Sequence, residues 1–185
     1  TESLEPWFRA LVHWFDEGYA LEMIREIISS ALLETDQQRN LPTNATIWCE
    51  LILTLSRKGR PEEALEALLS PASDSLAQAG IARSLVLCWM SIPSHHRTQE
   101  TLKDLIDLFV DAPDGDMACA MLLRNMLREG DEPSMQLLLQ RWATQHPGRE
   151  LRDDDELYQT LLDCDQTDAW VQAVAATTEP ENIIA

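Results

Sequence analysis

Positive charge is scarce in this 185-residue sequence, which has 14 Lys and Arg residues against 32 Asp and Glu residues and a net charge of −18. Such a chain repels a phosphate backbone unless its few cations gather on one face, so general nucleic-acid binding is disfavoured. The carboxylates either attract basic peptides and basic domains or form only a solvated exterior.

Long hydrophobic runs are also missing. The sequence contains no run of 18 apolar residues that could cross a bilayer, and no charged-then-apolar leader opens it. We therefore expect neither a membrane span nor a signal peptide. Because the chain starts at Thr1 without a methionine, we expect it to be a fragment of a larger protein.

Closely spaced cysteine pairs are absent as well. The four cysteines are 31 to 45 residues apart, and each lies within an apolar segment of helical period: Cys49, Cys88, Cys119 and Cys164. This pattern indicates small core residues and neither disulfides nor zinc ligands. It favours a reducing, intracellular compartment, either cytoplasmic or nuclear.

No constellation of residues has an enzymatic signature. The adjacent histidines His95 and His96 lie in a predicted turn, where neighbouring side chains point apart and cannot gather on zinc. The segment 163–168 begins like a calcium loop, but Val174 stands where a bidentate acid is required. The six glycines are isolated, so no phosphate-binding loop is formed. We expect no enzymatic activity, no metal and no cofactor.

What the sequence does contain is a recurring unit of two amphipathic segments joined by a short turn near a glycine. Gly59 follows Gly18 by 41 residues, and Gly130 follows Gly59 by 71 residues, which is close to two periods of about 35. One helical hairpin cannot bury both of its apolar stripes, so such units must stack. The sequence therefore predicts an all-α fold, a right-handed α-solenoid of about five helical hairpins.

The apolar periodicity and the breakers between segments give the expected boundaries. The five helix pairs are 4–15 with 20–33, 48–55 with 61–69, 75–92 with 98–109, 116–128 with 132–144, and 157–162 with 168–174. Polar residues at five helix starts are predicted caps: Ser3, Asn44, Asp74, Asp131 and Asp168. We expect one repeat domain over 1–176, a polar loop over 34–43 and a flexible tail over 177–185.

The second hairpin has the clearest pattern, best over 45–69. Large side chains in its first helix, a turn glycine and a small residue in its second helix are Trp48, Leu51, Leu55, Gly59 and Ala64. This pattern resembles tetratricopeptide and pentatricopeptide repeats. The resemblance implies helical hairpins that bind a partner along a groove lined by the first helices. For the pentatricopeptide family it implies RNA as the ligand.

Two tryptophans near the start are candidates for a docking surface. Trp7 and Trp14 are two helical turns apart and offset from the apolar stripe of their segment. Large aromatic side chains supply much of the energy of protein interfaces, so this pair could dock end to end in a homo- or hetero-oligomer. The other tryptophans lie on apolar stripes and are expected in the core.

Polar residues on the first helices complete the candidate partner-binding set: Arg9, His13, Glu50, Thr54, Arg83, Arg124, Asn125 and Arg128. The function they favour is a protein-interaction scaffold that holds a partner peptide, helix or subunit. Two alternatives stay open: an RNA-binding array, which the charge opposes, and a chaperone or regulatory domain that holds a client segment. The net charge favours a basic partner, whereas Arg83, Arg124 and Arg128 would favour an acidic motif.

Overall fold

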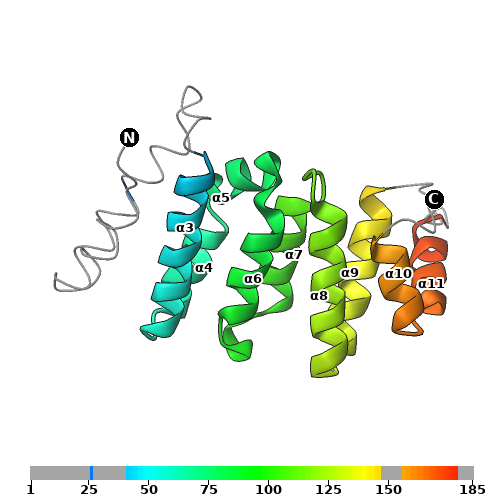
Figure 1. Ribbon diagram of the computed structural model, residues 1–185. Coiled ribbons are helices and arrows are strands. Elements are labelled where there is room, and N and C mark those ends of the chain that lie inside the picture. Colours follow the sequence, from blue (N-terminus) through cyan, green and yellow to red (C-terminus); the bar gives the residue numbers. More distant parts are fainter. Residues whose placement is uncertain (1–25, 27–40, 147–155, 179–185) are drawn as a thin grey trace, which may run out of the picture.

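The computed structural model describes residues 26, 41–146 and 156–178, and within these residues it contains helices and no strand (Figure 1). The prediction of an all-α fold is confirmed for the described residues. The elements are α3 (Leu41–Arg57), α4 (Pro61–Leu68), α5 (Pro71–Leu76), η2 (Ala77–Ile81), α6 (Ala82–Ser91), η3 (Ser94–His96), α7 (Gln99–Phe109), α8 (Gly115–Glu129), α9 (Glu132–Gln145), α10 (Glu156–Asp163) and α11 (Thr167–Thr178). None of the described helices combines the length and the apolar character that crossing a bilayer requires.

These helices stand side by side in two rows (Figure 1). In the first, here called row A, α3 contacts α6, α6 contacts α8, and α8 contacts α10. In the second, row B, α4 is followed by α5 with η2, and α7, α9 and α11 pack one against the next. Each row A helix other than α6 also contacts the row B helix that follows it in the chain. Neighbouring pairs therefore bury one another's apolar faces.

The core fills the space between the rows, and its members follow the predicted helical stripes. In α3 and in α7, apolar residues spaced three or four positions apart form one stripe along the helix, and this stripe is buried. The stripe residues are Trp48, Leu51, Ile52, Leu55, Leu102, Leu105, Ile106 and Phe109. Trp89, Trp142 and Trp170 are buried as well, which confirms the prediction that the tryptophans of these segments are core residues.

The start of α3 corrects one predicted boundary. The helix begins at Leu41, inside the segment 34–43 that was expected to be a loop. Pro42 is compatible with this start, because a proline in the first turn removes an amide that has no helical partner. Asn44, predicted as a cap, lies within the helix and is buried.

A second correction concerns the helix predicted over 75–92. A short helix, α5, begins at Pro71, and Gly80, inside η2, adopts a left-handed backbone with φ 82° that separates α5 from α6. Asp74 lies exposed within α5 and caps nothing. The prediction failed because the apolar period continues across Gly80, so the pattern alone does not reveal the break.

Several predicted helix ends are confirmed. The Thr98 hydroxyl accepts from the Thr101 amide at 3.2 Å, and the Asp131 carboxylate accepts from the Ser134 amide at 3.2 Å. Gly130 ends α8 in a left-handed conformation, with its amide and the next one donating to carbonyls of the last turn. Asp168 is wrong as a cap, because α11 already begins at Thr167.

The predicted first hairpin, 4–33, and its predicted cap Ser3 lie outside the described residues. The tail expected from residue 177 is corrected at its start, because α11 continues to Thr178. The rest of that tail lies outside the described part of the chain.

Candidate functional site

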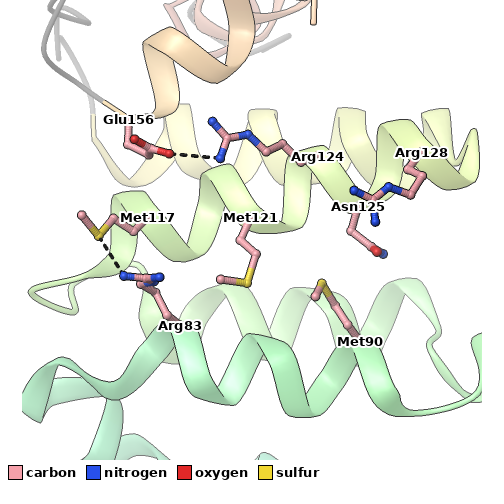
Figure 2. A pocket seen from close by; sticks show the side chains of 8 residues that line it. All are labelled: Arg83, Met90, Met117, Met121, Arg124, Asn125, Arg128 and Glu156. Carbon is pink, nitrogen blue, oxygen red and sulfur yellow. Dashed lines mark hydrogen bonds and ion pairs between the residues drawn. The ribbon is translucent and has the colours of Figure 1, made fainter. Parts of the chain in front are cut away.

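Four of the predicted partner-binding residues meet in one groove between α6 and α8 of row A (Figure 2). Here called the α6–α8 groove, it has a volume of about 280 Å³. It is lined by Arg83 and Met90 of α6, by Met117, Met121, Arg124, Asn125 and Arg128 of α8, and by Glu156 of α10. Side chains that the sequence places 41 or more residues apart therefore share one surface.

The helical period explains this convergence. On α8, residues 117, 121, 124 and 128 follow one another by three or four positions, so they share a face. The opposite face of α8 is apolar and buried in the core through Ala118, Leu122 and Met126. Figure 2 shows Met121 and Asn125 pointing from α8 toward α6, while Arg83 and Met90 point back from α6.

Hydrogen-bond donors predominate in the groove. Arg124 forms an ion pair with Glu156 at 3.1 Å, and both side chains are exposed at the groove's edge. In the described part of the chain, the Arg83 guanidinium donates to the Met117 sulfur, a weak acceptor, at 3.6 Å. Within the described residues Arg128 has no ion pair, and the buried Nδ2 of Asn125 has no hydrogen-bond partner.

A carboxylate from outside the groove holds its α6 wall in place. Asp114, at the start of α8, accepts hydrogen bonds from the amides of Ala82 and Arg83, both at 3.1 Å. Its own carbonyl accepts from the Ala118 amide, so the same residue begins α8. Asp114 thereby joins the first turns of the two helices that form the groove. Asp114 lies between the helices predicted over 98–109 and 116–128, and the sequence pattern does not reveal this role.

Apolar side chains stand at the solvent-facing side of the same helices. Leu87, one turn after Arg83 on α6, is 52% exposed, and Met117 on α8 is 45% exposed. Met117 lines the groove and Leu87 lies one turn from Arg83, so both add exposed apolar surface near the groove arginines.

Charge is distributed unequally between the two rows. The row A helices carry Arg57, Arg83, Arg124 and Arg128 against Glu50, Asp116, Glu129, Glu156 and Asp163. The row B helices carry Lys103 and Arg141 against Glu62, Glu63, Glu66, Asp74, Glu100, Asp104, Asp107, Glu132 and Asp168. Row A is therefore close to neutral, whereas row B contributes much of the net negative charge.

The remaining predicted site residues are not brought to this groove. Glu50 and Thr54 are half-buried on α3 and do not line it. The other four candidates, Trp7, Arg9, His13 and Trp14, lie outside the described residues.

Histidines and cysteines elsewhere in the described residues form no second candidate site. The ring centroids of His95 and His96 in η3 lie 4.2 Å apart with the ring planes tilted by 49°, so the expectation that these side chains point apart is wrong. The described residues contain no group of three or more potential metal ligands from His, Cys, Asp and Glu. None of the four cysteines forms a disulfide. Cys88 of α6 lies against Cys49 of α3, with its sulfur 3.7 Å from the Cys49 carbonyl.

The two thiols affect one another's ionisation. A hydrogen bond with the Cys49 thiol, together with burial, raises the pKa of Cys88 well above its usual range. The same hydrogen bond lowers the pKa of Cys49, although burial opposes that change. Cys88 is accordingly an inert core thiol, and Cys49 is the more reactive of the pair.

No protein-family model, curated protein or solved structure matches this chain. The likeness of residues 45–69 to tetratricopeptide and pentatricopeptide repeats therefore remains a prediction.

Proposed function

We propose that the protein is an interaction module that binds a segment of a partner protein along row A, with the α6–α8 groove at the centre of the contact. The observation that carries the proposal is the convergence of Arg83, Arg124, Asn125 and Arg128 with exposed apolar side chains in one hollow. Interfaces combine such apolar anchors with polar groups that fix orientation. A client-holding or regulatory domain would use the same face and differ only in its occupant.

We further propose that the two rows are part of a right-handed α-solenoid of five hairpins, with 4–33 as the first. The support is the row arrangement of the described helices, in which the row A helices pack side by side. We also propose an intracellular location, because the cysteine spacing is that of core residues and not of a disulfide framework.

The binding proposal is tested by selecting from a random 12-residue peptide library on the full chain. The enriched peptides are then mapped by hydrogen exchange of the backbone amides. We expect enrichment, with new protection confined to α6 and α8. An unenriched library, or protection confined to row B, would contradict the proposal.

Two matched variants sharpen this test. Met117→Ser removes an exposed apolar side chain from the groove, and Leu162→Ser removes one of similar exposure, 47%, from α10 outside the groove. We expect Met117→Ser to weaken binding of the enriched peptides about fivefold, the effect of roughly 1 kcal/mol. Leu162→Ser should leave the affinity unchanged.

A further inference from the structure

Resting on the proposed function, we propose that the α6–α8 groove is selective for an acidic segment, one whose carboxylates meet the groove arginines while an apolar side chain lies on the methionines. This choice of partner is opposite to the one that the net charge of −18 favours.

Hydrogen-bond donors outnumber acceptors in the groove. Among the described residues, Arg83 donates to a thioether sulfur, the exposed Arg128 has no ion pair, and the Nδ2 of Asn125 is buried without a partner. A buried donor without an acceptor costs about 1 to 3 kcal/mol, so a ligand acceptor that reaches Asn125 recovers this energy. Carboxylate oxygens are acceptors only, and they bind arginine with charge-assisted hydrogen bonds.

The groove already holds one carboxylate. Glu156 pairs with Arg124 at 3.1 Å from the edge of the hollow (Figure 2). This contact demonstrates, within the chain itself, the geometry in which an acidic side chain meets this face of α8. A ligand carboxylate would occupy the equivalent positions at Arg83 and Arg128, which Glu156 leaves open.

Three methionines also line the groove. Met90, Met117 and Met121 supply flexible, polarisable side chains that adapt to differently shaped apolar groups. A groove of about 280 Å³ has room for a small number of side chains and not for a folded domain. The occupant is therefore a short segment with an apolar residue beside its carboxylates, such as a leucine or methionine.

The range of the electrostatic forces limits which charges act on a bound ligand. Interactions between exposed charges are largely screened beyond about 8 Å at physiological salt, so the charges that line the groove have the greatest effect on a bound ligand. These are three arginines and one carboxylate, that of Glu156. The local charge thus decides the partner at contact.

The test is the charge of the peptides that the full chain selects from the random 12-residue library. We expect the enriched pool to contain more Asp and Glu than Lys and Arg. The most enriched peptide should lose at least tenfold in affinity when its Asp and Glu residues are replaced by Asn and Gln. A neutral or basic pool that protects α6 and α8 would overturn this inference and leave the proposed function standing, whereas no groove-bound peptide at all would overturn both.

Arginine variants assign the selectivity to the groove. Arg83→Gln and Arg128→Gln should each weaken binding of the acidic peptide about fivefold. The matched control is Arg57→Gln, because Arg57 is exposed on α3 and lies outside the groove, and it should leave the affinity unchanged. Glu156→Gln should instead strengthen binding about threefold, because it frees Arg124 for the ligand. A general folding defect cannot produce this gain, and an unchanged or weakened affinity in Glu156→Gln would overturn the inference.

RNA is the competing ligand for a cluster of arginines. A single-stranded RNA of 12 nucleotides serves as the probe, with its affinity measured between 50 and 200 mM salt. We expect it to bind more weakly than the acidic peptide at both concentrations. Tighter RNA binding that falls steeply with salt would assign the arginines to phosphates and overturn the inference.

Discussion

Asp114 shows how much one side chain can determine in this molecule. It begins α8 with its carbonyl and holds the first two amides of α6 with its carboxylate, across more than 30 residues of sequence. The first amides of a helix have no partner within the helix, so an acceptor from elsewhere stabilises that end. The negative charge of the carboxylate also interacts favourably with the positive, N-terminal end of the α6 dipole.

Asp114→Ala should therefore lower the free energy of unfolding by about 1 to 2 kcal/mol, the range of a lost helix cap. Asp114→Asn retains one acceptor oxygen and should lose less. The measurement is urea unfolding followed by circular dichroism. Asp111→Ala, an exposed residue of the same connection, should have little effect, and a loss as large as that of Asp114→Ala would contradict the capping role.

A second residue-scale contact joins α3 to α5. The Trp48 indole donates to the Ser73 hydroxyl at 2.8 Å, and that hydroxyl donates to the Ala67 carbonyl at 3.0 Å, with Trp48 and Ser73 fully buried. Ser73→Ala leaves the buried Trp48 indole N–H unpaired, whereas the Ala67 carbonyl keeps the Ser70 hydroxyl as a donor at 2.7 Å. The change should cost about 1 to 3 kcal/mol in unfolding free energy. In a Trp48→Phe background the same change should cost less, and equal costs in the two backgrounds would contradict the coupling.

The thiol pair gives a chemical prediction. Because the hydrogen bond from Cys88 lowers the pKa of Cys49, more of Cys49 is thiolate at neutral pH, whereas Cys88 is buried and its pKa is raised. Iodoacetamide should alkylate Cys49 at least about tenfold faster than Cys88 in the folded protein, as peptide mass spectrometry would measure. The rate at Cys49 should fall as the pH drops, because protonation removes the nucleophile. Equal rates in the native state would disprove this difference.

At the scale of the elements, sequence periodicity predicted most helices of the described part to within a few residues. It succeeded where a stripe, a cap and a breaker coincide, as at α7, where Thr98 precedes the buried face. It failed at α5 and η2, where Gly80 interrupts the backbone without interrupting the apolar pattern. It also failed at Leu41, because Pro42 was treated as a loop signal although a first turn accepts proline.

Gly115 lies where the end of α7 and the start of α8 approach so closely that no side chain fits. A Cβ at this position would lie 2.5 Å from the Phe109 carbonyl oxygen and 3.2 Å from the Trp142 ring, so backbone would have to shift. Gly115→Ala should cost more than about 2 kcal/mol in unfolding free energy, a core overpacking effect. Gly130→Ala is the matched control. A Cβ at Gly130 would meet open space, so only the left-handed backbone would be strained, and the expected loss of unfolding free energy is about 1 kcal/mol. The reverse order in urea unfolding would contradict this account.

At the scale of the whole molecule, four of the ten predicted binding residues met in the groove because the helices of row A pack side by side. The helical period predicts which side chains lie opposite the buried face of a helix, so the exposure of Arg83, Arg124 and Arg128 was predictable from the sequence. Which helices become neighbours depends on tertiary packing, so the exclusion of Glu50 and Thr54 from the groove was not predictable. The contact between Asp114 and α6 was hidden for the same reason.

Row packing also predicts how stability is distributed along the described chain. Helices α10 and α11 contact neighbours on α8 and α9, whereas α8 and α9 are flanked on both sides. Native-state hydrogen exchange should therefore give lower opening free energies for α10 and α11 than for α8, by about 2 kcal/mol or more. Equal values along these helices would mean that the two rows open as one cooperative unit.

The short segment of α5 and η2 has a further consequence for shape. It stands in row B between α4 and α7, while the corresponding row A helices, α3 and α6, touch directly. An additional element on one side of a double layer acts as a wedge, so we expect the axis of the stack to turn there, with row A on the inside of the bend. A bound strand crossing from α3 toward α8 would then follow the shorter, inner path of an arc.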